Sequence, residues 1–321
     1  MRLLLRGALG ASLIGVGAAT ASPSAWEATA AAQEVMAAVA EARTFAAGGM
    51  SETAIVAALL GARLGPLQSV GTTSITYQVD LAGPIDAAFK PETRLHPHGW
   101  LAEVAAYRIA RELALDSVPP AVVRSVERGQ LRRRLGESDL PAELVATGGV
   151  VRGAFIYWVP GLLRSDLDTP EGIARWQGWL RQGREVPDQE RVVARDLSNM
   201  LLFDYLIGNR DRLSGGNLRP AEGGRIVIRD HNLAFPFTLG ESGHERLLEM
   251  LMRTQRFSRT TIERLIAMNE ETLRTAMADE NPSMLLDARQ LAGLMERRAT
   301  ILSYVGSMIE AFGEEEALCF P

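Results

Sequence analysis

Residues 203–217 read FDYLIGNRDRLSGGN, and this stretch decides how the 321-residue chain is interpreted. An apolar helix is expected to end there, and Asp211 follows in a loop, where a carboxylate can accept a proton from a substrate hydroxyl. Thirteen residues after Asn217, Asp230 stands beside an amide in Asp230-His231-Asn232, at the end of a short predicted strand. A carboxylate in such a place can hold Mg²⁺, which prefers oxygen ligands. The simpler alternatives are a salt bridge from Asp211 to Arg210 or Arg212, and a turn cap at Asp230.

Lys90 is the only lysine among the 34 basic residues, and the other 33 are arginines. An ammonium is a compact point charge that can approach phosphate oxygens where a broad guanidinium does not fit. Lys90 ends the apolar segment Ala87-Ala88-Phe89, so the sequence predicts a phosphate-binding lysine at the end of a strand, unless a lone surface lysine has survived by chance. Glu103 is the one acid in a run of small and apolar helical residues, which predicts an ion pair with Lys90. The alternative for Glu103 is a solvated acid near a helix N-terminus.

A turn that contains Gly71 and Thr72 precedes the first predicted strand. Backbone N–H groups in such a turn can contact phosphate oxygens. The turn holds a single glycine, and segments of this kind are most often only turns. Gly71 and Thr72 are therefore a weaker expectation for nucleotide contact than Lys90.

Composition excludes several classes of protein. The chain is 47% apolar and 23% charged, which is the composition of a folded protein. Its net charge is −5 and it has no long basic run, so we expect no nucleic-acid partner. Cys319 is the only cysteine, which excludes an intrachain disulfide and a cysteine-based zinc site. We interpret Cys319 as incidental, because no partner base is apparent.

The first 21 residues have the pattern of an export signal. Arg2 and Arg6 precede a weakly apolar stretch, and Ala19-Thr20-Ala21 forms a small-residue cleavage pattern. The apolar stretch is short for a bilayer span, so we expect no stable membrane anchor. The alternative is an ordinary helix rich in Ala and Leu. With cleavage after Ala21, the protein would be secreted, periplasmic or in a secretory lumen.

The rest of the chain is rich in strands early and in helices late. We expect an α+β architecture of two lobes with a cleft between them, where ligand sites tend to lie. The expected parts are a helical N-terminal extension (22–64), a strand-containing lobe (65–160) and a mainly helical lobe (161–321). Residues 125–143 are expected to be a charged connection. The expected elements are a helix capped by Ser51, strands at 75–81, 85–90 and 150–159, and helices at 101–115, 170–183 and 188–208, with three more in 242–313.

At these motifs the chain resembles the atypical kinases of the secretory pathway, the Four-jointed and Golgi casein-kinase-like group. The phosphatidylinositol 3-/4-kinase-like enzymes are more distantly similar. The resemblance covers about residues 65–240 and is carried by the block from Phe203 to Arg212, and by Glu103 to Tyr107 with the following Val118-Pro119-Pro120. It implies a two-lobed protein-kinase-like fold that uses ATP with Mg²⁺ or Mn²⁺.

The same resemblance implies a role for each candidate residue. Asp211 would be the catalytic base and Asp230 a metal ligand. Lys90, paired with Glu103, would hold the nucleotide phosphates, and the strand that ends at Trp158 and Val159 would contact adenine. The second metal ligand of the family lies five residues after the base, at Gly216 in this chain; Asn217 is one residue further, and a bulge at Gly215-Gly216 would restore its reach.

These expectations amount to an exported kinase that transfers the γ-phosphate of ATP to a hydroxyl of a protein Ser/Thr or of a carbohydrate. Two alternatives stay open at this point. The shifted Asn217 and the single-glycine turn favour a nucleotide-binding pseudokinase that acts as an interaction module. A reversed nucleotide would give AMP transfer. His96 and His98 belong to a polar loop, with a metal cluster that includes Glu92 as the less favoured interpretation.

Overall fold

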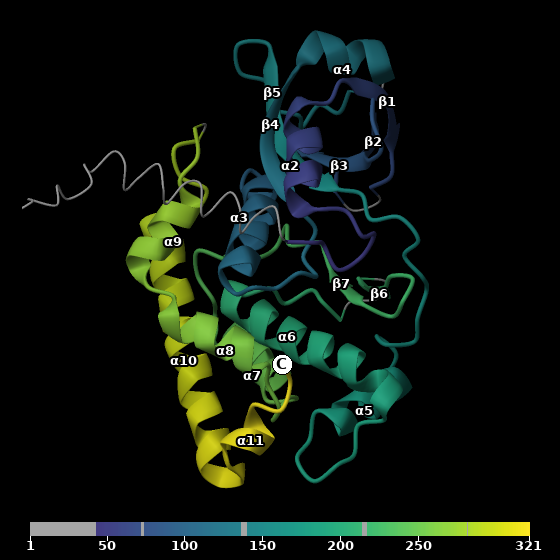
Figure 1. Cartoon of the computed structure of the whole chain (residues 1–321). Coiled ribbons are helices and arrows are strands. Elements are labelled where there is room, and N and C mark those ends of the chain that lie inside the picture. The colour runs from purple at the N-terminus through teal and green to yellow at the C-terminus, as the bar shows by residue number, and fades with distance from the viewer. Residues whose placement is uncertain (1–42, 72–73, 136–139, 214–216, 281) are drawn as a thin grey trace, which may run out of the picture. The chain divides into compact units, whose positions relative to one another are not determined.

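The computed structural model describes residues 43–71, 74–135, 140–213, 217–280 and 282–321. All of them belong to one compact unit, Glu41–Pro321. The expected signal segment and residues 22–42 of the expected helical extension lie outside the described residues. Figure 1 shows β1 to β5 gathered in one lobe and most of the helices in the other.

The N-terminal lobe is built around a five-stranded antiparallel sheet in the order β1-β2-β3-β5-β4. Strands at 75–81, 85–90 and 150–159 were expected, and each is present with slightly different ends. Its elements are α2 (Glu52–Gly61), β1 (Leu64–Ser69), β2 (Tyr77–Leu81), β3 (Asp86–Pro91), β4 (Ala121–Glu127), α4 (Arg128–Leu135) and β5 (Val150–Tyr157).

One face of this sheet forms a separate apolar core. Buried and partly exposed residues alternate along β3, so that Phe89 points into the core and Lys90 points to the opposite face. Phe89 packs against Tyr77 and Phe155, with ring centroids 6.3 and 4.7 Å away. Gly153 allows β5 to approach this pair, because a Cβ there would lie 2.5 Å from the Lys90 carbonyl oxygen.

Helix α2 covers part of the sheet and begins as the sequence predicts. The Ser51 side chain accepts a hydrogen bond from the backbone N–H of Ala54, which caps the helix. Ile55 and Leu59 are fully buried in the same core as the strands. Residues 52–61 therefore pack as part of the N-terminal lobe.

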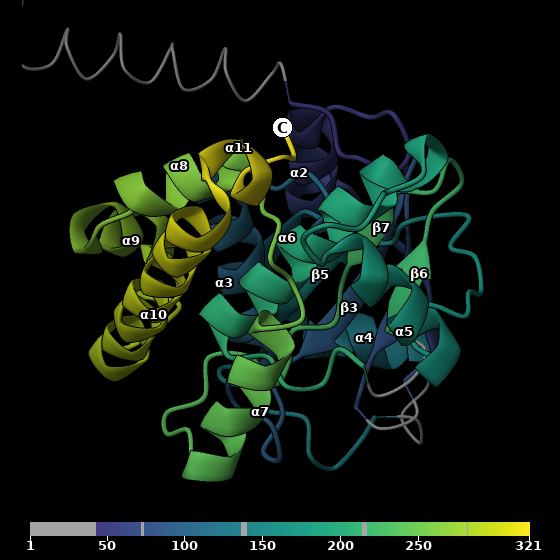
Figure 2. The same ribbon diagram turned by 90° about the horizontal axis from the view of Figure 1, so that it is seen from below.

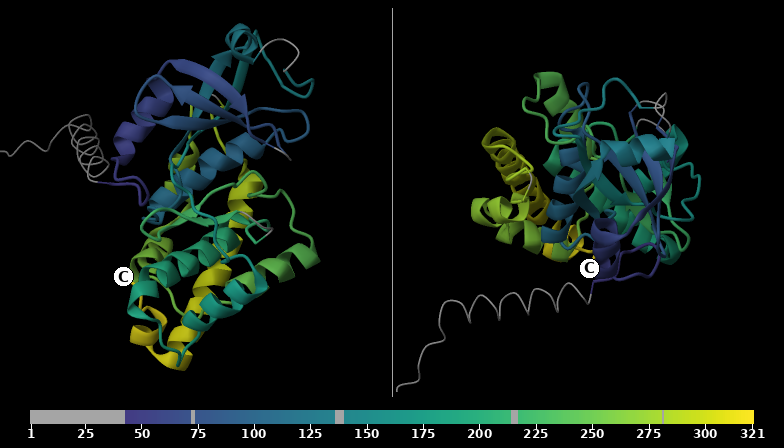
Figure 3. Two further views of the ribbon diagram at one scale, coloured as in Figure 1. Left: turned by 90° about the vertical axis from the view of Figure 1, so that its right-hand side faces the viewer. Right: turned by 90° about the horizontal axis from the view of Figure 1, so that it is seen from above.

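Helix α3 (Gly99–Glu112) connects the two lobes. It packs against β4 and β5 on one side and against α9 (Glu270–Met277) of the C-terminal lobe on another. Figure 3 shows α3, in blue, between the sheet and the helices of the other lobe. Ten of its fourteen residues are buried, and eight of these ten belong to the apolar core of the C-terminal lobe. Burial on most sides fixes where the helix sits, and so fixes Glu103 within it.

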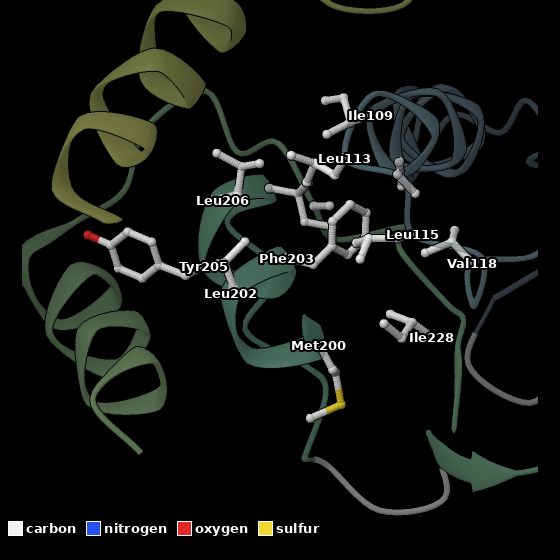
Figure 4. Close-up of a cluster of buried hydrophobic side chains, with 14 of the residues drawn as sticks. Ile109, Leu113, Leu115, Val118, Met200, Leu202, Phe203, Tyr205, Leu206 and Ile228 are labelled. Atoms are coloured by element: carbon white, nitrogen blue, oxygen red, sulfur yellow. The ribbon is translucent and has the colours of Figure 1, made fainter. Parts of the chain in front are cut away.

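The C-terminal lobe is organised around α6 (Arg191–Ile207), which follows the short helix η2 (Asp188–Glu190). Thirteen of its seventeen residues are buried. Figure 4 shows the cluster in which Phe203 and Leu206 of α6 face Ile109 of α3 and Leu113, the residue directly after that helix. Gly208 ends α6 in the left-handed conformation, with φ of 71°, which a glycine adopts without strain.

Three other helices of this lobe, α5, α7 and α10, pack against α6, and α10 lies alongside α8 and α9 (Figure 2). A two-stranded hairpin, β6–β7, lies between these helices and the N-terminal sheet (Figure 1). The remaining elements are α5 (Pro170–Trp179), β6 (Leu218–Pro220), β7 (Ile226–Ile228), α7 (Glu241–Leu251), α8 (Arg259–Ala267), α9 (Glu270–Met277), α10 (Ala288–Phe312) and α11 (Glu314–Ala317).

Several parts of the fold differ from the sequence expectation, and strands β4 and β6 are among the elements that were not expected. Residues 125–143, expected to be a connection, contain the end of β4 and all of α4. Strand β1 was not expected, and Gly65 and Pro66 within it hide the alternating pattern of a strand. Residues 242–313 contain four helices rather than three, because Ser258, Asn269 and Asp287 each cap a new one.

None of the helices in the described part of the chain combines the length and the apolar character needed to cross a bilayer.

We predict that Phe89→Ala lowers the free energy of unfolding by about 3 to 5 kcal/mol, because it leaves a cavity between two aromatic rings. Urea unfolding followed by circular dichroism measures this change. Phe312→Ala is the matched control, since Phe312 is exposed at the end of α10 and its loss should cost about 0.5 kcal/mol or less. Equal costs for the two variants would contradict the assignment of the core.

Candidate active site

Lys90, Glu103 and Asp230 meet at one point between the two lobes. The Lys90 ammonium lies 2.5 Å from Glu103 Oε1 and 2.6 Å from Asp230 Oδ1. Strand β3 supplies the lysine, α3 supplies Glu103, and Asp230 comes two residues after β7. The predicted ion pair between Lys90 and Glu103 is therefore present. Asp230 is a second partner of Lys90, which the sequence did not predict.

The three charges control one another's protonation. Burial alone would lower the pKa of Lys90, but the carboxylates of Glu103 and Asp230 outweigh it and raise that pKa above the ordinary value. Burial alone would raise the pKa of Asp230, yet Lys90 holds it below its ordinary value. The side chain of Asp230 is 34% exposed while that of Glu103 is 3% exposed. Asp230 therefore keeps an open side toward the cleft.

Asp211 is held in the loop after α6 by hydrogen bonds within that loop. The Asn209 side chain accepts a hydrogen bond of 3.2 Å from the Asp211 backbone N–H. The same side chain donates from Nδ2 to Asp204 Oδ1 at 3.2 Å. Asn209 thus connects the loop to the end of α6, which agrees with a positioning role for this residue.

A buried ion pair lies beneath the loop. Arg212 and Asp204 are both fully buried, and the guanidinium donates from Nε and Nη2 to the two carboxylate oxygens at 2.8 and 3.0 Å. Asp204 is therefore the buried carboxylate partner of Arg212. Arg212 also donates to the carbonyl oxygen of Arg229, next to Asp230. This one side chain connects the Asp211 loop to the segment that carries Asp230.

His231 extends the same network to Glu103. Its backbone N–H donates to Glu103 Oε1 at 3.0 Å. Its ring Nε2 lies 3.1 Å from the carbonyl oxygen of Ile228, which can only accept, so Nε2 carries the proton and Nδ1 accepts from Arg212 at 3.3 Å. Burial, reinforced by the charge of Arg212, lowers the pKa of His231 to about 3. The ring is therefore neutral at physiological pH.

Lys90, Glu103, Asp211, Asp230 and His231 line a cleft of about 990 Å³ between the lobes. Every candidate side chain in the described part of the chain reaches it, including Trp158 and Val159 at the end of β5. Trp158 uses its backbone N–H to donate to the Asp86 carbonyl oxygen. The candidates that line the cleft are Gly71, Lys90, Glu103, Trp158, Val159, Asp211, Asn217 and Asp230.

The turn before β2 is less clearly suited to bind phosphate. Gly71 lines the cleft, and a Cβ there would lie 1.8 Å from the Ser74 carbonyl oxygen, so the turn requires a glycine. However, the Gly71 N–H donates to the Thr76 carbonyl oxygen at 3.2 Å. Thr72 lies outside the described residues. The turn thus contributes shape to the cleft, with one N–H already used.

Asn217 and Asp230 offer oxygen ligands to the same cleft. Asn217 donates from Nδ2 to the Asp211 carbonyl oxygen at 3.1 Å, which fixes the orientation of its amide. The expected bulge at Gly215-Gly216 lies outside the described residues. No group of three or more His, Cys, Asp or Glu that would hold a metal by itself occurs among the residues described. The donors present fit Mg²⁺ or Mn²⁺, which take one or two carboxylate or amide ligands and complete their coordination with phosphates and water.

The histidines near the cleft do not form a metal cluster. His96 lines the cleft, whereas His98 packs edge-on against Phe237 with ring centroids 4.9 Å apart. Glu92 accepts a hydrogen bond from Arg152 instead. The favoured interpretation of these residues as a polar loop agrees with this arrangement.

Sequence reasoning missed the roles of Asp204, Arg212 and His231 in the network, and of Arg219 and Arg229 in the cleft. One signal was available for the first of these. Asp204 is a lone acid within the long apolar run of α6, and a buried acid needs a cationic partner. The partner itself was hidden among 33 arginines.

The comparisons with known proteins identify the fold. The sequence matches no protein-family model, and a search of curated proteins gives no significant match. Among solved structures, the Golgi casein kinase with Mn/ADP bound is 16% identical, with a TM-score of 0.59 over 82% of this chain and 77% of that one. Hydra Fam20 with sugar is 18% identical, with a TM-score of 0.60 over 83% of this chain and 91% of that one.

The chain has a kinase fold. The likeness drawn from the sequence motifs is thus confirmed at the level of the fold: an α+β architecture with an N-terminal sheet and a helical C-terminal lobe. In this kinase fold the cleft lies between the lobes, with Lys90 on the N-terminal side and Asp211 on the C-terminal side.

We predict that Asp204→Asn destabilises the protein by about 3 to 5 kcal/mol, because it leaves the buried Arg212 charge without its carboxylate. Urea unfolding measures the loss. Asp166→Asn is the matched control: it breaks the exposed pair with Arg175 and should change stability little. A similar small change in both variants would contradict a structural role for the buried pair.

His231 predicts a pH dependence of stability. Its pKa is about 3 in the folded protein and 6.5 ordinarily, so as pH falls from about 6.5 to about 3 the unfolded chain binds a proton that the folded protein does not. The stabilisation from the neutral ring is present above this range and is lost within it, by about 1.4 kcal/mol per pH unit.

Unfolding in urea at pH 7, 6, 5 and 4 tests this prediction. His231→Gln should be less stable at pH 7 but should lose stability less steeply toward acid, because the residue no longer titrates. His244→Gln, at an exposed position on α7, should keep the wild-type slope. An unchanged slope in His231→Gln would show that this histidine does not titrate as described.

Proposed function

We propose that this protein is a phosphotransferase that moves the γ-phosphate of ATP to a hydroxyl group with the help of Mg²⁺ or Mn²⁺. The observation that carries the proposal is the Lys90 ammonium held between Glu103 and Asp230, in the same cleft as Asp211. Phosphoryl transfer depends on positioning and charge, and it needs a cation on the phosphates, a metal site and a group that accepts the hydroxyl proton.

Each side chain has a distinct part in this proposal. Lys90 binds phosphate oxygens of the nucleotide, and Glu103 keeps its ammonium in place. Asp211 accepts the proton of the attacking hydroxyl, for which its carboxylate must reach the far side of the γ-phosphate. Trp158 and Val159 border the part of the cleft that receives the adenine base, and Gly71 lies next to the phosphates.

Asp230 and Asn217 would hold the metal ion. When bound, the ion neutralises charge on the phosphates. Asp230 is suited to this because one of its oxygens contacts Lys90 while the side chain stays partly exposed to the cleft. The Golgi casein kinase structure contains Mn and ADP, which supports a divalent metal and a nucleotide here.

The acceptor is a hydroxyl of a protein Ser/Thr or of a carbohydrate. The two similar structures are named as a casein kinase and as a Fam20 with sugar, and each name supports one of these acceptor classes. We further propose that the chain is exported through residues 1–21 as a signal peptide, that residues 22–64 lead into the fold, and that residues 65–160 and 161–321 are its two lobes.

We predict that Asp211→Asn lowers turnover by about 10²- to 10⁴-fold, because an amide cannot accept the hydroxyl proton. The measurement is metal-dependent ATP hydrolysis by the full chain, together with intact-mass analysis of acceptor proteins. Affinity for ATP should change little, since Asp211 does not hold the phosphates in this proposal.

Asp188→Asn is the control for the loss of one acidic charge. Asp188 is exposed in the short helix η2 before α6, whereas Asp211 follows the opposite end of α6. It should retain wild-type turnover. Full activity in Asp211→Asn would remove this mechanism. A wild-type protein that binds ATP without any turnover would instead favour a nucleotide-binding interaction module.

A further inference from the structure

Two arginines on the β6–β7 hairpin lie in the cleft and have no part in the mechanism above. Arg219 is in β6, Arg229 follows β7, and both line the same cavity as Lys90 and Asp230. Each is partly buried. A pocket for a small molecule is predominantly apolar with a few placed polar groups, so two guanidinium groups on one wall call for an explanation.

The register of the hairpin explains why both arginines reach the cavity. Leu218 pairs with Ile228, and Arg219 pairs with Val227. Side chains alternate between the two faces of a strand, so Leu218 and Ile228 point together into the helical core, where both are almost completely buried. Arg219 and Arg229 share the opposite face as diagonal neighbours across the two strands.

Anchoring of the hairpin holds this face toward the ligand. The Pro220 carbonyl oxygen accepts a hydrogen bond from the Leu163 N–H, which ties β6 to the segment after Trp158 and Val159. At the other end, the Arg229 carbonyl oxygen accepts from the buried Arg212. The hairpin that carries the two arginines is therefore held at both strands by hydrogen bonds to other parts of the fold.

The chemistry of this wall favours a phosphate group. Burial lowers the pKa of Arg229 and the charge of Arg219 lowers it further, so the two guanidinium groups repel each other, and an anion bound to both relieves that repulsion. The planar guanidinium presents paired N–H donors that match phosphate oxygens, which a single ammonium such as Lys90 does not.

We propose that Arg219 and Arg229 form a second phosphate-binding subsite in the cleft, separate from Lys90 and the metal ligands. It rests on the proposed function in one respect, namely that the phosphate belongs to the polyphosphate of ATP. The same chemistry would accept the phosphate of another phosphorylated compound, and the experiment below separates the two sources.

The test is the binding affinity of the full chain, measured by calorimetry, for MgATP, adenosine and inorganic pyrophosphate. Arg219→Gln should weaken MgATP and pyrophosphate by roughly 10- to 100-fold while adenosine binds as before. Arg219→Lys should lose less than Arg219→Gln, because it keeps the charge without the paired donors. Arg229→Gln should weaken the same two ligands.

Arg274→Gln is the matched control, since Arg274 is exposed on α9, and it should bind all three ligands as the wild type does. Thermal unfolding of each variant shows whether the fold is retained. If Arg219→Gln and Arg229→Gln fold and bind MgATP and pyrophosphate with wild-type affinity, the subsite is wrong while the proposed function stands.

The remaining outcomes separate the two proposals further. Binding of pyrophosphate that depends on both arginines, without any binding of MgATP by the wild type, would support the subsite and overturn ATP as its source. A wild-type protein that binds neither MgATP nor pyrophosphate would overturn both proposals.

Discussion

The position of every charged group in this cleft depends on the cost of burying charge. Lys90 and Glu103 are removed from water almost completely, and a buried charge is tolerated only where opposite charge and hydrogen bonds replace the lost solvation. Glu103 meets this requirement with the Lys90 ammonium and the His231 N–H. The lysine meets it with two carboxylates. Strand β3, helix α3 and the end of β7 must therefore meet at one point for the fold to be stable.

A second buried ion pair connects the two segments that carry Asp211 and Asp230. Arg212 and Asp204 are fully buried, and the same guanidinium reaches the carbonyl oxygen of Arg229 and the ring of His231. The loop that carries Asp211 and the segment that carries Asp230 are thus fixed relative to each other by polar contacts rather than by apolar packing alone. Networks of this kind are strong when every member is satisfied and weak when one is missing. The neutral His231 contributes hydrogen bonds to this network that an apolar side chain at the same position could not make.

The two apolar cores determine on which side of the cleft each charged residue lies. The N-terminal sheet has its own core around Phe89, and the larger core joins α3 to the helices around α6. Helix α3 packs with the second core while it contacts the strands of the first lobe. Glu103 is consequently held to the helical side, and Lys90 to the strand side, of the same cleft. The ion pair between them spans the junction of the lobes.

Much of this arrangement could be predicted from single residues and short patterns. The alternation of apolar and polar residues at 75–81 predicted β2, Ser51 predicted a helix start, and the lone Lys90 with the lone Glu103 predicted the ion pair. The patterns failed where local signals were masked, as in β1 with Gly65 and Pro66 and in α4, where a run of arginines read as a connection.

The amino-acid sequence alone determined which residues carry charge in an apolar setting, because an acid within an apolar run and a single lysine can be recognised from the sequence. Only the tertiary structure decided which charged residues pair with each other. Arg212 has Asp211 beside it in the chain but contacts Asp204, and Arg219 and Arg229 lie on one face of the hairpin because of its register. Pairing depends on distance in space, and with 33 arginines in the chain no spacing rule distinguishes the one that folding buries.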